Sequence, residues 1–380
     1  VSDQYGKFSL YMVVSGTLKN DMTLINPRTG TIEKIGHIYS MQGKKNIEVN
    51  EIACGDLGAV SKLTDTKTGD TLCDPKLNRA LPGISFNPPC YAMAISPKIK
   101  GQEDKIAAGL NRLADEDPTF TIVNNSETHQ MVISGAGDIH LDVLCSKLKN
   151  KFGVEVELFP ARVPYREKVR KTVKVQGRHK KQSGGHGQFG DVWIEFGPQD
   201  ETEDLIFEEK IFGGSVPKNF HPAVEKGLRD SIGRGVLAGY PVVFLKATLV
   251  DGSYHEVDSS EMAFKTAASL AFKAGLPLAS PVILEPIGAL RVTIPDTYMG
   301  DIMSDLSKRR GSPMGMSAEN GLQIVEAEVP MAEMSSYAID LRSMTQGRGS
   351  FTCEFIRYEE TPAAIQQKII EDAKARAEAE

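Results

Sequence analysis

The sequence predicts a multidomain α+β protein, and three observations carry this prediction. Its 380 residues exceed the usual size of one compact domain. Short β-rich runs separated by Gly, Asn and Asp fill the region up to about residue 74, which indicates a small β-barrel. Two later regions repeat the order βαββαβ, which is typical of a ferredoxin-like sandwich. We therefore expect a barrel, two such sandwiches and a further α+β domain between them.

The composition excludes several classes of protein. Hydrophobic residues make up 41% of the chain and charged residues 25%, which is ordinary for a folded protein and excludes general disorder. The 44 Lys and Arg against 50 Asp and Glu give a formal net charge of −6, so any contact with nucleic acid must be a local patch. No signal peptide or transmembrane stretch is evident, which predicts a cytoplasmic protein without membrane contact. The first residue is not Met, which suggests that something upstream is missing.

The barrel is expected over residues 1–80, and the first sandwich over residues 88–162. Between them the segment LPGISFNPP holds three prolines and a glycine, so we expect a linker there. A strand follows from Tyr91, and the next segment places three apolar side chains at helical spacing: Ile106, Leu110 and Leu113. Strands in TFTIV and HQMVIS, a helix from about Asp138 and a strand from Val154 complete the βαββαβ order.

The region at residues 163–282 is expected to be an α+β unit. Strands are predicted in VKV, VWIEF and PVVFLKATLV, and helices near His221–Arg234 and from Ser259 to Ala274. Alanine recurs every fourth residue in the second helix, so its backbone can approach the sheet closely: Ala263, Ala267 and Ala271.

The second sandwich is expected over residues 283–360. It takes a strand in GALRVTI, a helix from about Met299 to Arg310, hairpin strands in GMSAENGLQIVEAEV, a helix over about 331–343 and a strand in SFTCEFIRY. The tail at 361–380 predicts a charged helix whose apolar anchors are Ile365, Ile369 and Ile370.

Motifs for nucleotide chemistry and catalysis fail in their context. GxGxxG occurs at Gly185, Gly187 and Gly190, but it follows HKKQS, which is not expected as a strand, and it precedes the strand VWIEF instead of a helix. The chain has no GxxxxGK[ST] and no GxSxG. Its five cysteines lie far apart, without CxxC, which supports neither a disulfide frame nor a zinc site. We expect no catalytic residue, no metal site and no cofactor in this chain.

A basic segment is the first candidate for contact with nucleic acid. Between Arg166 and Lys181 eight Lys and Arg residues face a single acid, Glu167, and the chain then opens into QSGGHGQFG. A glycine loop with exposed amides beside lysines can settle on a phosphodiester backbone. The alternative is a solvated basic face beside a hairpin. The acidic run QDETEDLIFEEK weakens the nucleic-acid hypothesis if it folds back onto the basic strand.

A second loop, DGSYHEVDSSE, precedes the alanine-striped helix. Asp258 or Ser259 is expected to cap that helix, which explains half of the loop. No structural role is evident for Tyr254 and His255, which can stack on a base or donate to a phosphate. The alternative for His255, as for His140, is an ordinary hydrogen-bonded residue, since no metal-ligand spacing surrounds it.

Three arginines lie in predicted loops of the last sandwich. Arg309 and Arg310 belong to RRG, and Arg348 belongs to QGRG. Each alone is expected at the surface, and together they make a second basic edge that can read RNA by shape.

The motifs along the chain, taken in order, resemble those of bacterial translation elongation factor G. They are SGTLKND, TGDTLCD, LADEDPTF, SGAGDIHLDVL, KKQSGGHGQFGDVWIEF, GSYHEVDSSEMAFK, DLSKRRG and YAIDLRSMTQGRGSF. The resemblance runs from about Gly6 to Tyr358. It implies the part of the factor after its GTP-binding domain: domain II as a translation-protein type β-barrel, ferredoxin-like domains III and V, and domain IV with a fold like ribosomal protein S5 domain 2.

The resemblance implies a function in moving tRNA and mRNA through the ribosome, with domain IV at the decoding region. The implied partners are the ribosome, with its 16S and 23S rRNA and its proteins, and tRNA and mRNA, for a monomer in the cytoplasm. GTP and Mg²⁺ would belong to the absent GTP-binding domain of a GTP-hydrolysing parent. This chain itself would perform no chemistry.

The resemblance also assigns residues. The first tip loop of domain IV would be Lys180, Lys181, Gln182, Ser183, Gly184, Gly185, His186, Gly187 and Gln188. The second tip loop would be Gly252, Ser253, Tyr254, His255 and Glu256, with His255 at the apex. In domain V the residues facing rRNA would be Arg309, Arg310 and Arg348.

Two departures keep alternatives open. The main bacterial factor usually has Arg at the position of His186, and its GMGELHLD is GAGDIHLD here. These departures favour a paralogue for ribosome recycling or rescue as one alternative. A ribosome-binding protein that works alone without a GTPase domain is another.

Overall fold

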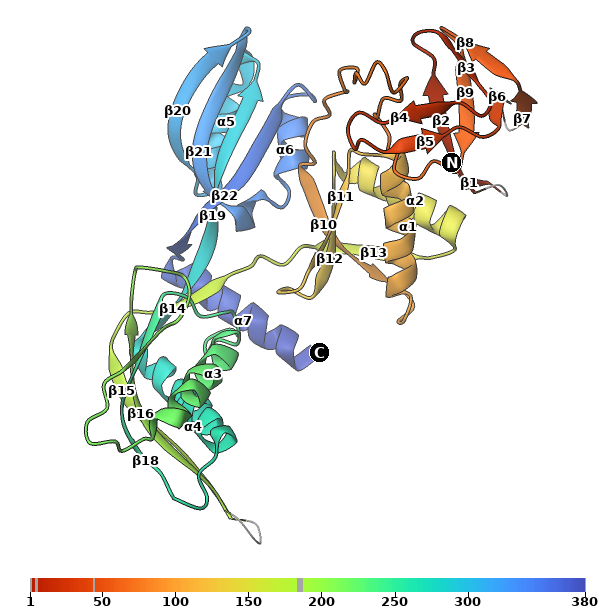
Figure 1. The fold of residues 1–380 in the computed structure, drawn as a ribbon. Coiled ribbons are helices and arrows are strands. Elements are labelled where there is room, and N and C mark those ends of the chain that lie inside the picture. Colours follow the sequence, from red (N-terminus) through yellow and green to blue (C-terminus); the bar gives the residue numbers. More distant parts are fainter. Residues whose placement is uncertain (1, 4–5, 44, 183–186, 380) are drawn as a thin grey trace. The chain divides into compact units, whose positions relative to one another are not determined.

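The computed structural model describes residues 2–3, 6–43, 45–182 and 187–379 (Figure 1). The chain separates into two compact units, Val1–Ala161 and Arg162–Glu380. Both units mix strands and helices, so the predicted multidomain α+β class is confirmed. No helix in the described ranges is long and apolar enough to span a membrane.

The first nine strands make three small sheets that share one core. They are β1 (Ser2–Asp3), β2 (Gly6–Met12), β3 (Thr17–Lys19), β4 (Thr23–Ile25), β5 (Ile32–Lys34), β6 (Ile38–Gln42), β7 (Lys45–Val49), β8 (Glu51–Ala53) and β9 (Leu57–Ser61). The largest sheet has the order β1-β2-β9-β6-β7, while β3 pairs with β8 and β4 with β5. Leu24, Ile38 and Ile52 come from different sheets and are buried together. Among the described residues these strands do not close into one hydrogen-bonded ring.

The predicted linker is confirmed, because residues 81–90 form neither helix nor strand. The sandwich after it consists of β10 (Tyr91–Pro97), α1 (Glu103–Glu116), β11 (Thr121–Asn125), β12 (Gln130–Gly135), α2 (Asp138–Phe152) and β13 (Val156–Pro160). Its sheet order is β11-β12-β10-β13, and all pairs are antiparallel. The apolar helix faces predicted from the sequence form the core, with Leu110 and Leu144 fully buried.

The next sheet belongs to the C-terminal unit and has the order β15-β16-β18-β17. Its strands are β15 (Val173–Lys181), β16 (Gln188–Pro198), β17 (Ile206–Glu209) and β18 (Leu245–Ser253), and its helices are η1 (Lys218–Phe220), α3 (His221–Ile232), α4 (Glu261–Gly275) and η2 (Leu276–Ala279). Phe196 and Leu249 of the sheet and Phe264 and Phe272 of α4 lie in the same core. This core occupies one face of the sheet, and the other face carries charged, polar and aromatic side chains.

The second sandwich has the same strand order as the first. It contains β19 (Pro281–Ile294), η3 (Asp296–Tyr298), α5 (Met299–Lys308), β20 (Ser312–Glu319), β21 (Leu322–Pro330), η4 (Met331–Met334), α6 (Tyr337–Met344) and β22 (Ser350–Glu360). The strands run in the order β22-β19-β21-β20. The repeat of architecture predicted from the sequence is therefore confirmed.

The strand β14 (Arg166–Val169) joins this second sandwich, although the sequence suggested that its residues belong to the domain before it. Its backbone pairs with residues 281–284 of β19. The side chain of Glu167 on β14 is buried and accepts hydrogen bonds from four backbone amides at 236–240, the shortest from Val236 at 2.7 Å. The strand thus connects the segment at 236–240, which precedes β18 and is called here the base of the β15–β18 sheet, to the last sandwich.

The tail forms α7 (Ala363–Ala379) as predicted. Ile369 is buried, and the Gln366 side chain accepts a hydrogen bond from the Ile283 amide at 3.2 Å. Near its end the Arg376 guanidinium donates to the Tyr240 hydroxyl at 3.0 Å. The helix is therefore anchored to β19 and to the base of the β15–β18 sheet.

Three predictions about elements were wrong in detail. HKK before the glycine loop is part of strand β15, because its backbone pairs with β16 up to Lys181. The helix predicted at 331–343 is divided into η4 and α6. Neither β14 nor β17 was predicted, since each is only four residues long.

Candidate nucleic-acid interface

The hairpin of β15 and β16 carries the first predicted tip loop. Its register runs from Val173 opposite Phe196 to Lys181 opposite Gln188. Lys180, Lys181 and Gln182 are exposed at this end, and Gln188 starts the return strand. The predicted residues Ser183, Gly184, Gly185 and His186 lie outside the described residues. The part that is described places a pair of lysines at the end of a long antiparallel hairpin.

Helix α4 packs its backbone directly on this hairpin. A Cβ atom added at Gly177 would lie 2.1 Å from the carbonyl oxygen of Ala267, and one at Gly190 would lie 2.6 Å from the carbonyl carbon of Ala263. Only glycine opposite alanine allows this approach. The close contact predicted from the alanine stripe is confirmed, and it gives the hairpin a stiff support.

The segment directly after the second predicted tip loop is hydrogen-bonded to Gly187 of the first and to the start of β16, about seventy residues away in the chain. The Gly187 amide donates to the Asp258 carboxylate at 2.9 Å, and the Phe189 amide donates to the Asp258 carbonyl at 2.8 Å. The Ser259 hydroxyl donates to the Phe189 carbonyl at 3.0 Å. These contacts fix the second loop against the base of the first.

The histidine of the second loop has a structural role, as the alternative of an ordinary hydrogen-bonded residue predicted. His255 Nδ1 accepts hydrogen bonds from the amides of Val257 at 3.3 Å and Asp258 at 3.2 Å. An Nδ1 that accepts leaves the ring proton of neutral imidazole on Nε2. The side chain is 56% exposed, and Nε2 has no hydrogen-bond partner among the residues described. His255 therefore shapes the loop with one nitrogen and presents an N–H donor with the other.

The N-cap of α4 is Ser260, and neither Asp258 nor Ser259 as predicted. The Ser260 hydroxyl accepts the Ala263 amide at 3.2 Å. Asp258 and Ser259 are residue types that commonly cap helices, but their side chains bond to Gly187 and Phe189 instead. The helix begins one to two residues later than expected because the preceding residues tie the two loops together.

The remaining residues of the second loop differ in exposure. A Cβ at Gly252 would lie 2.3 Å from the Asp191 carbonyl oxygen, so the strand end needs glycine there. The Ser253 hydroxyl donates to the Asp191 carboxylate at 2.7 Å. Tyr254 is 45% exposed, and Glu256 is exposed too. The loop is thus held at both ends and open in the middle.

Sequence reasoning missed Phe212, which is 93% exposed. Its loop follows β17 and starts beside the middle of β18, where the Lys210 amide donates to the Leu249 carbonyl at 2.8 Å. Gly213 and Gly214 both have positive φ angles, 75° and 73°, which allow the chain to turn after the aromatic residue. The signal was present in the sequence as a phenylalanine followed directly by two glycines.

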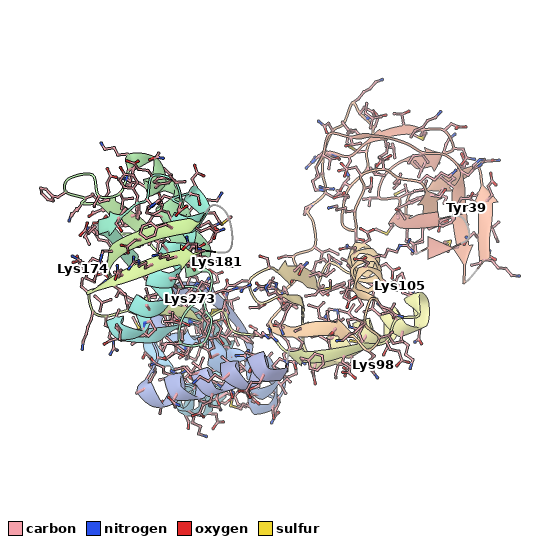
Figure 2. All side chains as sticks on the ribbon, turned by 90° about the horizontal axis from the view of Figure 1, so that it is seen from below. Tyr39, Lys98, Lys105, Lys174, Lys181 and Lys273 are labelled. Carbon is pink, nitrogen blue, oxygen red and sulfur yellow. The ribbon has the colours of Figure 1, made fainter. Side chains whose placement is uncertain are left out.

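The basic segment divides into two parts with different surroundings. Lys168 on β14 pairs with Asp200 at 2.8 Å and Arg170, directly after β14, pairs with Glu360, so these cations are neutralised. On β15, Lys180 and Lys181 have no ion pair within the ranges that the structure describes. Figure 2 shows Lys174 and Lys181 near the two ends of β15. The positive potential available to a ligand is therefore on β15.

The acidic run after the hairpin contacts the basic segment through Asp200, which pairs with Lys168, but the strand of the run does not lie along β15. Its strand β17 pairs in parallel with β18, at the sheet edge opposite β15. There Glu208 pairs with Lys246 at 2.7 Å. The condition that would have weakened the nucleic-acid hypothesis is thus not met on β15.

Two of the three arginines predicted as a basic surface edge are instead engaged in ion pairs. Arg309 is 12% exposed, and it pairs with Asp305 at 2.7 Å and Asp340 at 2.6 Å. Arg310 makes a two-bond pair with Glu285, which is 3% exposed, at 2.6 and 2.8 Å. Asp305 lies one helical turn before Arg309, whereas Asp340 and Glu285 come from other parts of the sequence, so the sequence around RRG could not show those two partners.

Arg348, the third of these arginines, is exposed. Its backbone amide donates to the Thr345 carbonyl at 3.1 Å, and its guanidinium has no ion pair in the described part of the chain. The predicted basic edge therefore contains one available arginine.

The other candidate side chains have ordinary structural roles. His140 contacts Asp117 at 3.1 Å and accepts the Ala136 amide at 3.1 Å, as the structural alternative predicted. Its partner Asp117 is partly buried, which raises its pKa, but hydrogen bonds from Thr119 and His140 bring the pKa below the usual value. No group of three metal-ligating side chains occurs in the ranges 2–3, 6–43, 45–182 and 187–379.

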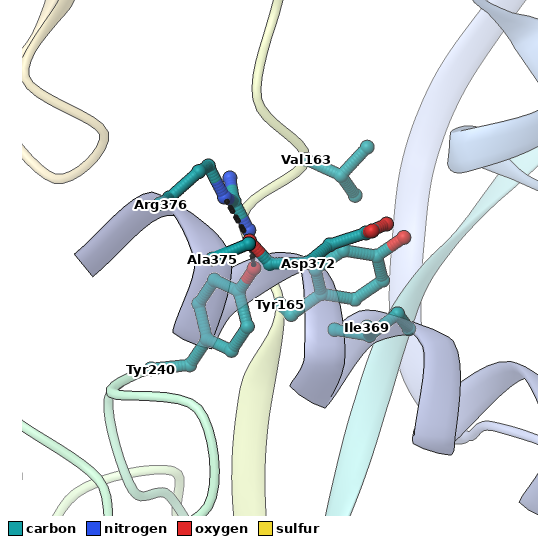
Figure 3. A pocket seen from close by; sticks show the side chains of 7 residues that line it. All are labelled: Val163, Tyr165, Tyr240, Ile369, Asp372, Ala375 and Arg376. Atoms are coloured by element: carbon teal, nitrogen blue, oxygen red, sulfur yellow. Dashed lines mark hydrogen bonds between the residues drawn. The ribbon is translucent and has the colours of Figure 1, made fainter. Parts of the chain in front are cut away.

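A pocket of about 530 Å³ lies where α7 meets the base of the β15–β18 sheet (Figure 3). The rings of Tyr165 and Tyr240 meet edge to face at 5.3 Å, and burial raises the pKa of Tyr165 to about 12. The residues that line the pocket are Val163, Tyr165, Tyr240, Ile369, Asp372, Ala375 and Arg376. Since Arg376 bonds to Tyr240, the pocket is part of the anchorage of α7.

Four family models match the chain in succession. The model described as elongation factor Tu domain 2 matches residues 6–73, and elongation factor G domain III matches residues 86–160. Elongation factor G domain IV matches residues 161–280, and the elongation factor G C-terminus matches residues 282–369. Both candidate tip loops lie within the domain IV match, and the three arginines lie within the C-terminal match.

A solved structure is similar over the whole chain. It is a crystal structure of a protein from Thermus thermophilus, with 38% sequence identity and a TM-score of 0.82. The match covers 98% of this chain and 56% of that one, so the chain spans little more than half the length of this neighbour.

Proposed function

We propose that the chain, which belongs to the elongation factor G family, acts in translation as the ribosome-binding part of a translocase. Elongation factor G domain models match it in order from residue 86 to 369, after the match of residues 6–73 to elongation factor Tu domain 2. In this proposal the protein promotes GTP-dependent movement of tRNA and mRNA, and domain IV acts at the decoding region. The four matched domains do not include a GTP-binding domain. The proposal therefore assigns GTP, Mg²⁺ and hydrolysis to a domain outside these 380 residues.

One observation carries the proposal: two loops meet at the end of a braced hairpin. Asp258 bonds to both Gly187 and Phe189, so His255 is held close to the end that carries Lys180. Lysines without acidic partners suit phosphate oxygens, and the His255 N–H suits a phosphate or a base edge. The glycine and alanine contacts of α4 stiffen this end, so it can keep its shape against a moving RNA.

The test is translocation by the full-length protein carrying both His255→Ala and Lys180→Ala. We expect slower movement of mRNA, followed by a fluorescent label at its 3′ end, with GTP hydrolysis unchanged. Lys273→Ala serves as the control, because Lys273 lies in the last turn of α4, at the end of the helix away from the second loop. Unchanged translocation in the double variant would contradict the role assigned to the tip.

A second test uses the 380-residue chain alone. Binding through phosphate contacts weakens steeply as salt displaces counterions, so we expect ribosome binding to fall linearly in log K against log salt. Binding that ignores salt would exclude an RNA-facing tip and would leave a contact with ribosomal proteins as the explanation.

A further inference from the structure

The open face of the β15–β18 sheet carries side chains that the tip loops do not account for. Side chains alternate between the two faces of a strand. Gly177 and Gly190 face α4, so Gln176 and Arg178 on β15, and Phe189 on β16, face away from it. The same alternation places Lys174, Lys180, Asp191 and Trp193 on the open face. This face is continuous with the tip, because both use the hairpin of β15 and β16.

Two cations on this face lie over two aromatic rings. The Lys174 ammonium is 5.6 Å from the centre of the Trp193 ring, and the Arg178 guanidinium is 5.6 Å from the centre of the Phe189 ring. Both cations are exposed and both rings are partly exposed. The two rings lie four positions apart on β16, or about 13 Å. The face therefore presents two separate aromatic and cationic positions.

Polar side chains occupy the space between these two positions. The Asp191 carboxylate is buried, and it accepts hydrogen bonds from the Gln176 amide at 2.8 Å and the Ser253 hydroxyl at 2.7 Å. Two exposed acids belong to this face: Glu195 lies opposite Lys174 at the end away from the tip, and Asp251 on β18 lies opposite Trp193. Toward the tip the exposed charges are those of Arg178 and Lys180. Positive charge thus increases along the face in the direction of the tip.

We propose that this open face, with Trp193, Phe189, Lys174 and Arg178, binds a single-stranded RNA segment that leads to or from the tip. Aromatic side chains on an exposed sheet stack with unpaired bases, and neighbouring cations hold the phosphates. Single strands suit the face because a duplex does not expose the faces of its bases to stack on the two rings. The inference rests on the proposed function and adds a second RNA surface to it.

The chain offers a direct probe, because Trp193 is its single tryptophan. A base that stacks on the indole quenches its fluorescence. We expect an unlabelled octamer of uridine to quench the emission of the 380-residue chain and to protect Trp193 from acrylamide. A hairpin duplex RNA of equal charge is expected to quench much less.

Variants locate the binding. Phe189→Leu and Arg178→Gln keep the fluorophore and are each expected to weaken octamer binding about tenfold, as loss of one stacked or cation contact does. Lys273→Gln removes one charge from α4, on the other face, and is expected to change binding less than twofold. Circular dichroism checks that each variant is folded.

Three results would overturn the inference. They are the absence of quenching at saturating octamer, equal weakening by Lys273→Gln and Arg178→Gln, and equal quenching by a glutamate octapeptide, which would indicate an acidic protein surface. Ribosome binding by the same variants separates this inference from the proposed function. If the tip variants lose ribosome binding while the octamer leaves Trp193 unchanged, the proposed function stands and the open-face site fails.

Discussion

The tip of domain IV and the RRG turn of the last sandwich have similar sequences and different chemistry. Both place adjacent cations before a glycine-containing segment, Lys180 and Lys181 in the tip, Arg309 and Arg310 in the turn. The turn directs its guanidinium groups into carboxylates from other elements, with Glu285 almost fully buried. The tip lysines have no such partners in the described part of the chain. The comparison teaches that adjacent cations in a sequence are available to a ligand only where the fold does not pair them with carboxylates.

The largest effect is expected from a substitution that breaks an ion pair of the RRG turn. Arg310→Met leaves the Glu285 carboxylate buried without its partner, which costs about 3 kcal/mol in similar cases. We expect denaturant unfolding of the C-terminal unit to shift by this amount, while ribosome binding at a temperature where the variant is folded stays unchanged.

Arg348→Met is the matched control, since that arginine is exposed and without an ion pair among the residues described. If Arg310→Met were as stable as this control, the turn would not be held by its ion pairs, and the contrast with the tip would fail.

The second effect concerns the support of the tip. Gly177→Ala adds a Cβ that would lie 2.1 Å from the Ala267 carbonyl oxygen. Because this distance is too short for a contact, α4 must move away from the hairpin. Such overpacking costs roughly 2 kcal/mol. We expect lower thermal stability together with weaker ribosome binding. Gly233→Ala is the control, because no atom lies within 4 Å of its added Cβ and its φ is −64°.

The third prediction concerns a substitution that removes a hydrogen bond between the two loops and leaves every lysine and arginine in place. Asp258→Ala removes the acceptor of the Gly187 amide, at a cost of about 1 kcal/mol. If the loops form one surface, ribosome affinity falls several-fold even though the tip becomes more positive. Glu256→Ala makes the same change in charge at an exposed position and should not weaken binding. Equal or tighter binding by Asp258→Ala would show that the loops act separately.

The smallest effect is acid sensitivity of the turn. Hydrogen bonds from Ser336 and Arg309 lower the pKa of Asp340 below its usual value of 3.8. The stabilisation is complete above the unfolded pKa, and it is lost as the pH falls through the lower folded pKa. Because Asp340 is 43% exposed, we expect only about 0.5 kcal/mol. Arg309→Met should flatten this dependence in thermal unfolding between pH 2 and pH 6; an unchanged slope would contradict it.

The sequence predicted the features that depend on local spacing. Ala263 and Ala267 recur at helical spacing, so their close contact with a glycine strand could be expected before the partners were known. The apolar faces of α1 and α2 were predicted for the same reason. Repeated small or apolar side chains report on packing because every copy points to the same side of the helix.

Features that depend on distant partners could not be predicted. Arg309 meets Asp340, and Arg310 meets Glu285, over 31 and 25 residues of chain. The loop around His255 presented three neighbouring residues able to cap a helix, and the contact of Asp258 with Gly187 selected Ser260. In both cases the outcome depends on which strand lies alongside, which the local sequence does not specify.

The most direct test of the central claim is the salt dependence of ribosome binding by the 380-residue chain with both Lys180→Ala and Lys181→Ala. Two lost phosphate contacts should reduce the slope of log K against log salt by about 1.5 and weaken binding at low salt. The control, Lys218→Ala with Lys273→Ala, removes two exposed lysines from helical segments of the same domain and should keep the slope. Equal slopes for the two double variants would contradict the account, because the unpaired lysines of the tip would then contact no RNA.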